Sequence, residues 1–147
     1  MASEIQPHQL SIEQLNGLRQ QHEDEINELS RQLESLQQAK QRFITSRTTL
    51  DEISSSGNGD TVLVPLNNSL YVPGKISNPQ KVMVELGTGY YCEKDINGAK
   101  ELIDRKMQLI AKSMESVENM GNGKRKTLEQ LMQIMQYKMQ SLGGGSK

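Results

Sequence analysis

The sequence predicts an α+β fold in which a long antiparallel two-helix coiled coil is joined by two β-hairpins. Two observations lead to this prediction. Apolar residues recur about every 3.5 positions on both sides of the middle of the chain, and this is the spacing of a coiled coil. Between these two stretches the spacing falls to two residues, which is the period of a β-strand.

The composition favours a long, thin protein over a globular domain with a thick core. Only 34% of the 147 residues are hydrophobic and 3% are aromatic. The net charge of −1 gives no electrostatic reason to expect a nucleic acid or an anionic membrane as partner. Cys92 is the single cysteine and cannot form an internal disulfide. Because no apolar run reaches the ~18 residues of a membrane span, we expect a cytoplasmic protein.

The first helix is expected over residues 11–53, after a disordered lead-in at residues 1–10. Ser11 and Gln14 form a capping box, in which each side chain can accept a hydrogen bond from the backbone of the other residue. A run of serine and glycine residues over 54–59 then ends the helix. The expected coiled-coil seam consists of Leu15, Leu18, His22, Ile26, Leu29, Leu33, Leu36, Lys40, Phe43, Arg47 and Leu50.

Residues 54–94 are expected to form a double β-hairpin that drives assembly. Apolar residues alternate up to a turn-forming segment at 67–69, and the same pattern recurs about twenty residues later. Isolated hairpins are marginally stable and have unpaired backbone edges, so we expect these strands to complete a sheet built from several chains. The residues expected to mediate subunit assembly are Val62, Val64, Leu66, Leu70, Val72, Val82, Val84, Leu86 and Tyr91.

The second helix is expected over residues 95–142, before a flexible tail at 143–147. Asp95, Asn97 and Gly98 supply the capping and turn chemistry at its start. Each glycine in the segment 121–123 costs about 1 kcal/mol relative to alanine, so a kink and a continuous helix both remain possible there. The expected seam consists of Ile103, Met107, Ile110, Met114, Val117, Gly121, Lys124, Leu128, Leu131, Met135, Lys138 and Leu142.

The residues that could support catalysis or ligand binding have simpler structural explanations. The segment 87–89 (GTG) is followed by strand-forming residues, which favours a hairpin turn over a phosphate-binding loop. Cys92 has no base nearby in the sequence, and the two histidines, His8 and His22, lie far from it along the chain. The basic run 124–126 is more typical of a solvated bend than of a nucleic-acid site. We therefore expect no enzyme activity, metal or cofactor.

The end of the second helix carries more apolar residues than one two-helix seam can bury, so some of them should be exposed. Six of the eight methionines lie in this helix, and flexible thioether side chains suit a surface that accommodates many apolar partners. An antiparallel pairing places the start of the first helix beside them. The residues expected to form this binding surface are Ile12, Leu15, Leu18, Leu131, Met132, Met135, Met139 and Leu142.

Three segments resemble the linker of α-class subunits of the prefoldin family: 62–66 (VLVPL), 69–75 (SLYVPGK) and 87–94 (GTGYYCEK). The resemblance extends over residues 11–142 in the order helix, double hairpin, helix. Two departures are the glycines of segment 121–123, within a helix that is expected to be continuous, and Cys92 in place of the usual valine.

The resemblance implies a hexameric, ATP-independent co-chaperone in which the hairpins join an inter-subunit β-barrel. Its partners would be one further α-class and four β-class subunits. The ends of the coiled coils would hold unfolded actin and tubulin and pass them to the group II chaperonin. The alternative is a structural coiled-coil scaffold or tether that does not bind clients, where a client is an unfolded protein held by the complex.

Overall fold

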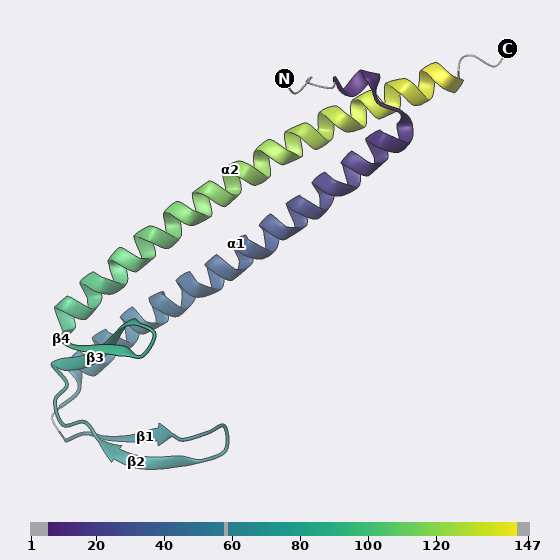
Figure 1. Cartoon of the computed structure of the whole chain (residues 1–147). Coiled ribbons are helices and arrows are strands. Elements are labelled where there is room, and N and C mark those ends of the chain that lie inside the picture. The colour runs from purple at the N-terminus through teal and green to yellow at the C-terminus, as the bar shows by residue number, and fades with distance from the viewer. Residues whose placement is uncertain (1–5, 58, 144–147) are drawn as a thin grey trace. The chain divides into compact units, whose positions relative to one another are not determined.

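A computed structural model of the chain describes residues 6–57 and 59–143 (Figure 1). The expected lead-in residues 1–5, Asn58 of the helix-ending segment and the tail residues 144–147 lie outside the described residues. The elements follow the predicted order of helix, two hairpins and helix, so the α+β fold class is confirmed. They are a short 3-10 helix η1 (Pro7–Gln9), α1 (Ile12–Ser55), β1 (Thr61–Pro65), β2 (Tyr71–Lys75), β3 (Lys81–Gly87), β4 (Tyr90–Asp95) and α2 (Ile96–Gly143).

The chain divides into two compact units, which are described separately. The terminal unit comprises residues 1–37 and 112–147, and the hairpin unit comprises residues 38–111. In the terminal unit, Leu15 packs with Leu131, whereas the later Glu25 pairs with the earlier Lys124. In the hairpin unit, Arg47 pairs with Asp104, whereas the later Asp51 pairs with the earlier Lys100. The two helices are therefore antiparallel within each unit, as the sequence predicts.

Both long helices begin at the side chains that the sequence indicates. The backbone N–H of Ser11 donates to Oε1 of Gln14 at 3.0 Å, and the N–H of Gln14 donates to Oγ of Ser11 at 3.2 Å, which completes the capping box. At the start of α2, the N–H of Gly98 donates to Oδ1 of Asp95 at 2.8 Å. These bonds satisfy backbone donors that have no partner inside a helix.

The helix α2 continues through Gly121 and Gly123 without a break. The structure thus selects the continuous helix from the two possibilities that the sequence leaves open. Tertiary packing explains this outcome, because Val117 and Leu131 on either side of the glycines are buried and outweigh the low helix propensity of this short segment.

The predicted seams are confirmed with one exception. Every seam residue assigned to the first helix is buried or half-buried, and the same holds for the second helix from Ile103 to Lys138. Leu142 was also expected at the seam, but it is exposed. It lies one residue before the end of α2, whereas the start of α1 already pairs with α2 around Leu131 and Met135.

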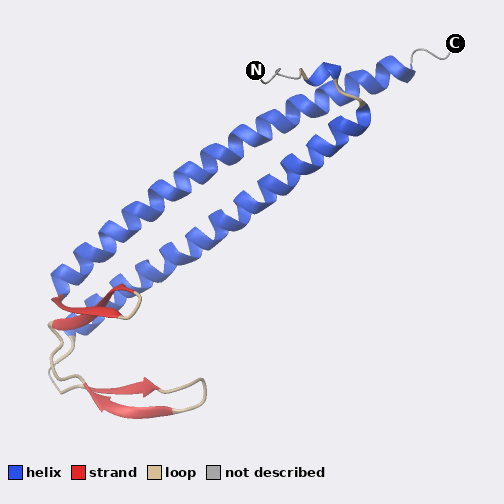
Figure 2. Ribbon diagram, in the orientation of Figure 1, coloured by secondary structure: helices blue, strands red, loops and turns tan. Residues whose placement is uncertain are grey.

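In the hairpin unit the four strands form two separate antiparallel pairs (Figure 2). The first hairpin, β1–β2, pairs Thr61 with Lys75 at one end and Pro65 with Tyr71 at the other. In its turn, Oδ1 of Asn67 accepts hydrogen bonds from the N–H groups of Ser69 and Leu70. Leu66 and Leu70 were expected to lie within the strands. The structure instead places both in the connection between β1 and β2.

The second hairpin, β3–β4, turns at the glycine-containing segment 87–89. Gly87 pairs with Tyr90, and Gly89 has a φ of 79°, a conformation that glycine adopts at little cost. The predicted hairpin turn at this segment is confirmed. A bulge between Glu85 and Gly87 shifts the register near the turn and leaves Leu86 exposed.

Each unit has its own small apolar core. In the hairpin unit, residues from both helices form a buried cluster and the second hairpin packs on it. In the terminal unit, Leu15 packs with two residues of α2. The first cluster comprises Leu50, Ile96, Ala99 and Ile103, with Phe43, Ile53, Val82, Val84 and Met107 against it, and the second comprises Leu15, Leu131 and Met135, with Leu10, Leu18 and Ile134 against it.

Residues 1–10 were expected to be a disordered lead-in, and the part that the structure describes, residues 6–10, includes the short 3-10 helix η1. Pro7 occupies the first position of the 3-10 helix, where its fixed φ and missing N–H are tolerated. Leu10 then packs against the buried cluster of the terminal unit. A single apolar residue after a proline turn gives too weak a sequence signal to predict this contact.

Candidate functional site

The first hairpin presents apolar side chains on both of its faces. Val62 and Val64 project from one face, while Leu63 is 69% exposed and Tyr71 is 55% exposed on the other. Leu66 and Leu70, in the connection, are also exposed. A two-stranded ribbon with this much exposed apolar surface is marginally stable alone, so it is suited to burial against other chains.

The second hairpin differs because one of its faces is already covered. Val82 and Val84 were expected to mediate assembly, but they pack on the chain's own helices around Leu50 and Ile103. Tyr91 and Leu86, which were also expected at the interface, are exposed. Met83 is exposed as well, and it was not predicted because it alternates with the apolar residues that were assigned to the interface.

A groove of about 700 Å³ lies between the second hairpin and the helices of the hairpin unit. Lys106 lines it, and its Nζ donates to the backbone oxygen of Glu85 at 3.2 Å. The same Nζ lies 5.8 Å from the centroid of the Phe43 ring, within the range of a cation–π interaction. The first contact joins the hairpin to α2 and the second joins α2 to α1, and the groove walls also include Leu102.

The residues predicted to form the client-binding surface separate into a buried and an exposed set. Leu15 is fully buried and Met135 is only 8% exposed, and Leu131 is buried with them. Leu18 and Ile12 are half-buried. The heptad pattern separates most of them, because the buried Leu131 and Met135 are seam positions and the exposed Met132 and Met139 are not. The exposed set is Met132, Met139 and Leu142.

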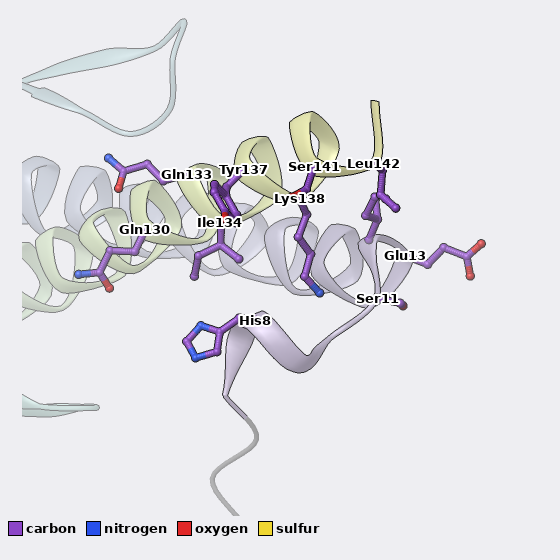
Figure 3. A pocket seen from close by; sticks show the side chains of 11 residues that line it. His8, Ser11, Glu13, Gln130, Gln133, Ile134, Tyr137, Lys138, Ser141 and Leu142 are labelled. Atoms are coloured by element: carbon purple, nitrogen blue, oxygen red, sulfur yellow. The ribbon is translucent and has the colours of Figure 1, made fainter. Parts of the chain in front are cut away.

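A groove of about 1140 Å³ lies between the lead-in and the last turns of α2 (Figure 3), and Leu142 is the member of the exposed set that lines it. Ile12 and Leu142, both predicted, line this groove. Ile134 and Tyr137, which were not predicted, line it too. Tyr137 is 72% exposed. An aromatic ring at a helix position outside the seam was the sequence signal that could have predicted this surface residue.

Polar seam residues in the terminal unit pair across the two helices. Nζ of Lys124 donates to Oε2 of Glu25, and Nδ1 of His22 lies 3.8 Å from the same oxygen. The hydrogen bond from Lys124, with further contributions from Gln21 and His22, lowers the pKa of the Glu25 carboxyl below its ordinary value. This pairing fixes which α1 position meets which α2 position.

The hairpin unit repeats this arrangement with two ion pairs. Nε and Nη2 of Arg47 donate to the two carboxylate oxygens of Asp104 at 2.9 and 3.3 Å, a bidentate geometry. Nζ of Lys100 donates to Asp51, and this contact lowers the pKa of the Asp51 carboxyl. The polar residues near the seam thus serve helix pairing.

The structure also bears on a metal site and on a membrane-spanning helix. Within residues 6–57 and 59–143, no group of three His, Cys, Asp or Glu side chains is arranged to hold a metal ion. In those same ranges, no helix is both long and apolar enough to cross a lipid bilayer. Cys92 is half-buried on β4, opposite Val84.

The fold is of the class in which an antiparallel helical pair is joined by two β-hairpins, and the first hairpin carries exposed apolar surface. Comparisons with known proteins identify the family. A sequence profile described as prefoldin subunit matches residues 11–141. The chain belongs to the prefoldin family.

Individual relatives agree with this assignment. The chain is 38% identical over 130 residues to probable prefoldin subunit 5 of Dictyostelium discoideum, with 88% of this chain and 81% of the relative covered. It is 32% identical over 142 residues to prefoldin subunit 5 of Homo sapiens, with 97% of this chain and 92% of the relative covered. The resemblance seen in the strand segments is thereby confirmed.

A solved structure shows the same fold. The cryo-EM structure of filamentous PFD from Methanocaldococcus jannaschii superposes with a TM-score of 0.73 and 22% sequence identity, covering 80% of this chain and 97% of that chain. At this identity the likeness supports the arrangement of helices and hairpins and nothing more specific.

Proposed function

We propose that this chain is a subunit of a cytoplasmic prefoldin hexamer that captures unfolded proteins without ATP and transfers them to the group II chaperonin. The observation that carries the proposal is the presence of two separate exposed apolar surfaces, one on each unit. The first hairpin presents one surface, and the last turns of α2 present the other. A subunit that only assembles would need the first surface alone.

The first hairpin supports assembly with other prefoldin subunits. Its apolar faces and its free backbone edges favour strand pairing with another chain. We infer that the partners are one further α-class and four β-class subunits, whose strands complete a β-barrel with these hairpins. The membership of the prefoldin family supports this inference.

The terminal unit supports client binding. Met132, Met139, Tyr137 and Leu142 are all exposed on the last turns of α2, and Tyr137 and Leu142 also line an open groove. Each large apolar side chain that is buried against a client contributes about 1.5 to 3 kcal/mol at most, before the client is ordered. Several such weak contacts suit an unfolded chain, and we infer that actin and tubulin are among the clients.

The proposal can be tested with a complex reconstituted from this chain and its partner subunits. Native mass spectrometry measures whether a hexamer forms, and light scattering measures the aggregation of chemically unfolded actin diluted into buffer without nucleotide. We expect a hexamer that slows aggregation in proportion to its concentration. A hexamer that forms but leaves aggregation unchanged would contradict client capture and support the alternative, a structural scaffold or tether.

A further inference from the structure

The lead-in of the chain occupies an apolar seat on the terminal unit. Leu10 is extended, with φ of −84° and ψ of 148°, and its side chain packs against the cluster of Leu15, Leu131 and Met135. The backbone oxygen of Leu10 accepts a hydrogen bond from Nζ of Lys138. The seat thus holds an extended segment by one aliphatic side chain and one main-chain carbonyl.

Lys138 has a role here that the coiled-coil pattern does not explain. It stands at a seam position where an apolar residue would pack between the helices, and it is half-buried. An ammonium group in such a place needs an acceptor, and the Leu10 carbonyl supplies one. In Figure 3 the side chains of Ile134 and Lys138 project from α2 on the side where the segment carrying His8 lies.

The two contacts of the seat differ in whether they depend on the sequence of the bound segment. Every residue of a peptide carries a backbone carbonyl, so the bond from Lys138 is independent of sequence. The buried cluster selects a large aliphatic side chain, because only such a side chain fills the place of Leu10. Ile134 belongs both to the surroundings of this cluster and to the wall of the adjacent groove, so the seat and the groove are continuous.

We infer that the seat of Leu10 is a binding site for an extended segment of an unfolded polypeptide, and that the lead-in is an internal ligand of this site. The incoming segment inserts one Leu, Ile or Met side chain beside Met135 and offers its own carbonyl to Lys138. It must displace the lead-in to do so. This inference rests on the proposed capture of unfolded chains and assigns that capture a particular seat.

The test uses the reconstituted complex with methyl-labelled methionine in this chain only, observed by NMR. Removal of residues 1–10 should shift the Met135 methyl signal and leave that of Met132, which lies outside the cluster, unchanged. A synthetic peptide of residues 6–11 (QPHQLS) added to the truncated chain should then restore the Met135 signal. The same peptide with serine in place of leucine should not restore it, and the intact chain should not respond to either peptide.

Two further variants make the result decisive. In the full-length chain, Leu10→Ser empties the seat but keeps the lead-in. This variant replaces the truncated chain in the experiment if the truncated chain does not enter the complex. Lys138→Met keeps the apolar stem and loses the donor, and it should weaken peptide binding about tenfold. Equal binding of the leucine and serine peptides, or equal binding to intact and vacated chains, would overturn the inference.

The aggregation assay distinguishes a failure of this inference from a failure of the proposed function. A complex that slows actin aggregation while the peptide leaves the Met135 signal unmoved would overturn the seat alone. A complex in which the peptide restores the Met135 signal but aggregation is not slowed would support the seat and contradict client capture.

Discussion

A lysine at a coiled-coil seam needs a partner for its ammonium group. In the terminal unit, α2 has two seam lysines, and their partners differ. Lys124 pairs with the Glu25 carboxylate, whereas Lys138 donates to a backbone oxygen of the lead-in. The first contact joins the two helices and the second holds a segment outside them. At the scale of single residues, departures from the heptad pattern therefore mark specific contacts.

The Glu25 contact predicts a pH dependence. Lys124 lowers the pKa of Glu25 in the folded chain, so the pair stabilises the fold above the ordinary pKa of glutamate. This stability is lost as the pH falls below about 4.3 and through the lowered pKa. NMR titration of the Glu25 carboxyl carbon should show a pKa that rises when Lys124 is replaced by Met. An unchanged Glu25 pKa in Lys124→Met would contradict the assigned cause.

At the scale of elements, the missing side chain of Gly121 leaves a defect in the seam of the terminal unit. A cavity of about 280 Å³ lies beside it, with walls that include Ile26, Leu33 and Val117. A Cβ atom built on Gly121 would meet no heavy atom within 4 Å, so a side chain can be added there without a clash. The neighbouring Gly123 is exposed and also has open space.

These two glycines allow a matched prediction. Leucine at either position should gain roughly 1 kcal/mol from helix propensity. Gly121→Leu should gain up to about 1.5 to 3 kcal/mol more, because its side chain fills the cavity. Hydrogen exchange of α2 amides in the complex measures the free energy of local opening. Equal stabilisation by Gly121→Leu and Gly123→Leu would show that the cavity is not a packing defect.

The hairpins permit a test that separates assembly from folding. Val64→Asp should prevent entry into the hexamer, because burial of an unpaired carboxylate costs several kcal/mol. Val84→Asp should instead destabilise the chain itself, since Val84 packs on the buried cluster of the hairpin unit. Thr61→Asp, at the exposed start of β1, is the control. Native mass spectrometry measures whether each variant enters the hexamer. Normal incorporation of Val64→Asp would mean that the face of the first hairpin that carries Val64 is not an interface.

The sequence predicted the elements well because their signals are local. The capping box at Ser11 and the hairpin turn at Gly89 depend on neighbouring residues, and the heptads repeat over whole helices. The roles of Val82 and Val84 were not predictable in the same way, because an apolar face looks alike whether it packs on its own helices or on a partner. The exposure of Leu142, despite its seam position, likewise depends on where the start of α1 meets α2.

At the scale of the whole molecule, the exposed apolar surfaces predict that the chain is not stable as a monomer. The first hairpin and the last turns of α2 both leave large apolar side chains exposed in the single chain. Burial against partners should supply the missing stability, so folding and assembly are linked. Analytical ultracentrifugation of the chain at micromolar concentration should show aggregates or oligomers. A folded monomer with cooperative unfolding would contradict this expectation.

The central claim is that the exposed end of α2 holds clients while the hairpins hold the complex together. The direct test is a hexamer in which this chain is the only full-length subunit and the helices of the other five are shortened. Met132, Tyr137 and Met139 are replaced together by Ser, and Leu109→Ser, an exposed apolar residue of the hairpin unit, is the control.

Capture of unfolded actin by this hexamer is the decisive measurement. The triple variant should form the hexamer normally but bind unfolded actin at least about tenfold more weakly, because three apolar contacts are lost. The Leu109→Ser hexamer should bind actin as the unmodified one does. Unchanged actin capture by the triple variant would contradict the claim and favour a scaffold that does not bind clients.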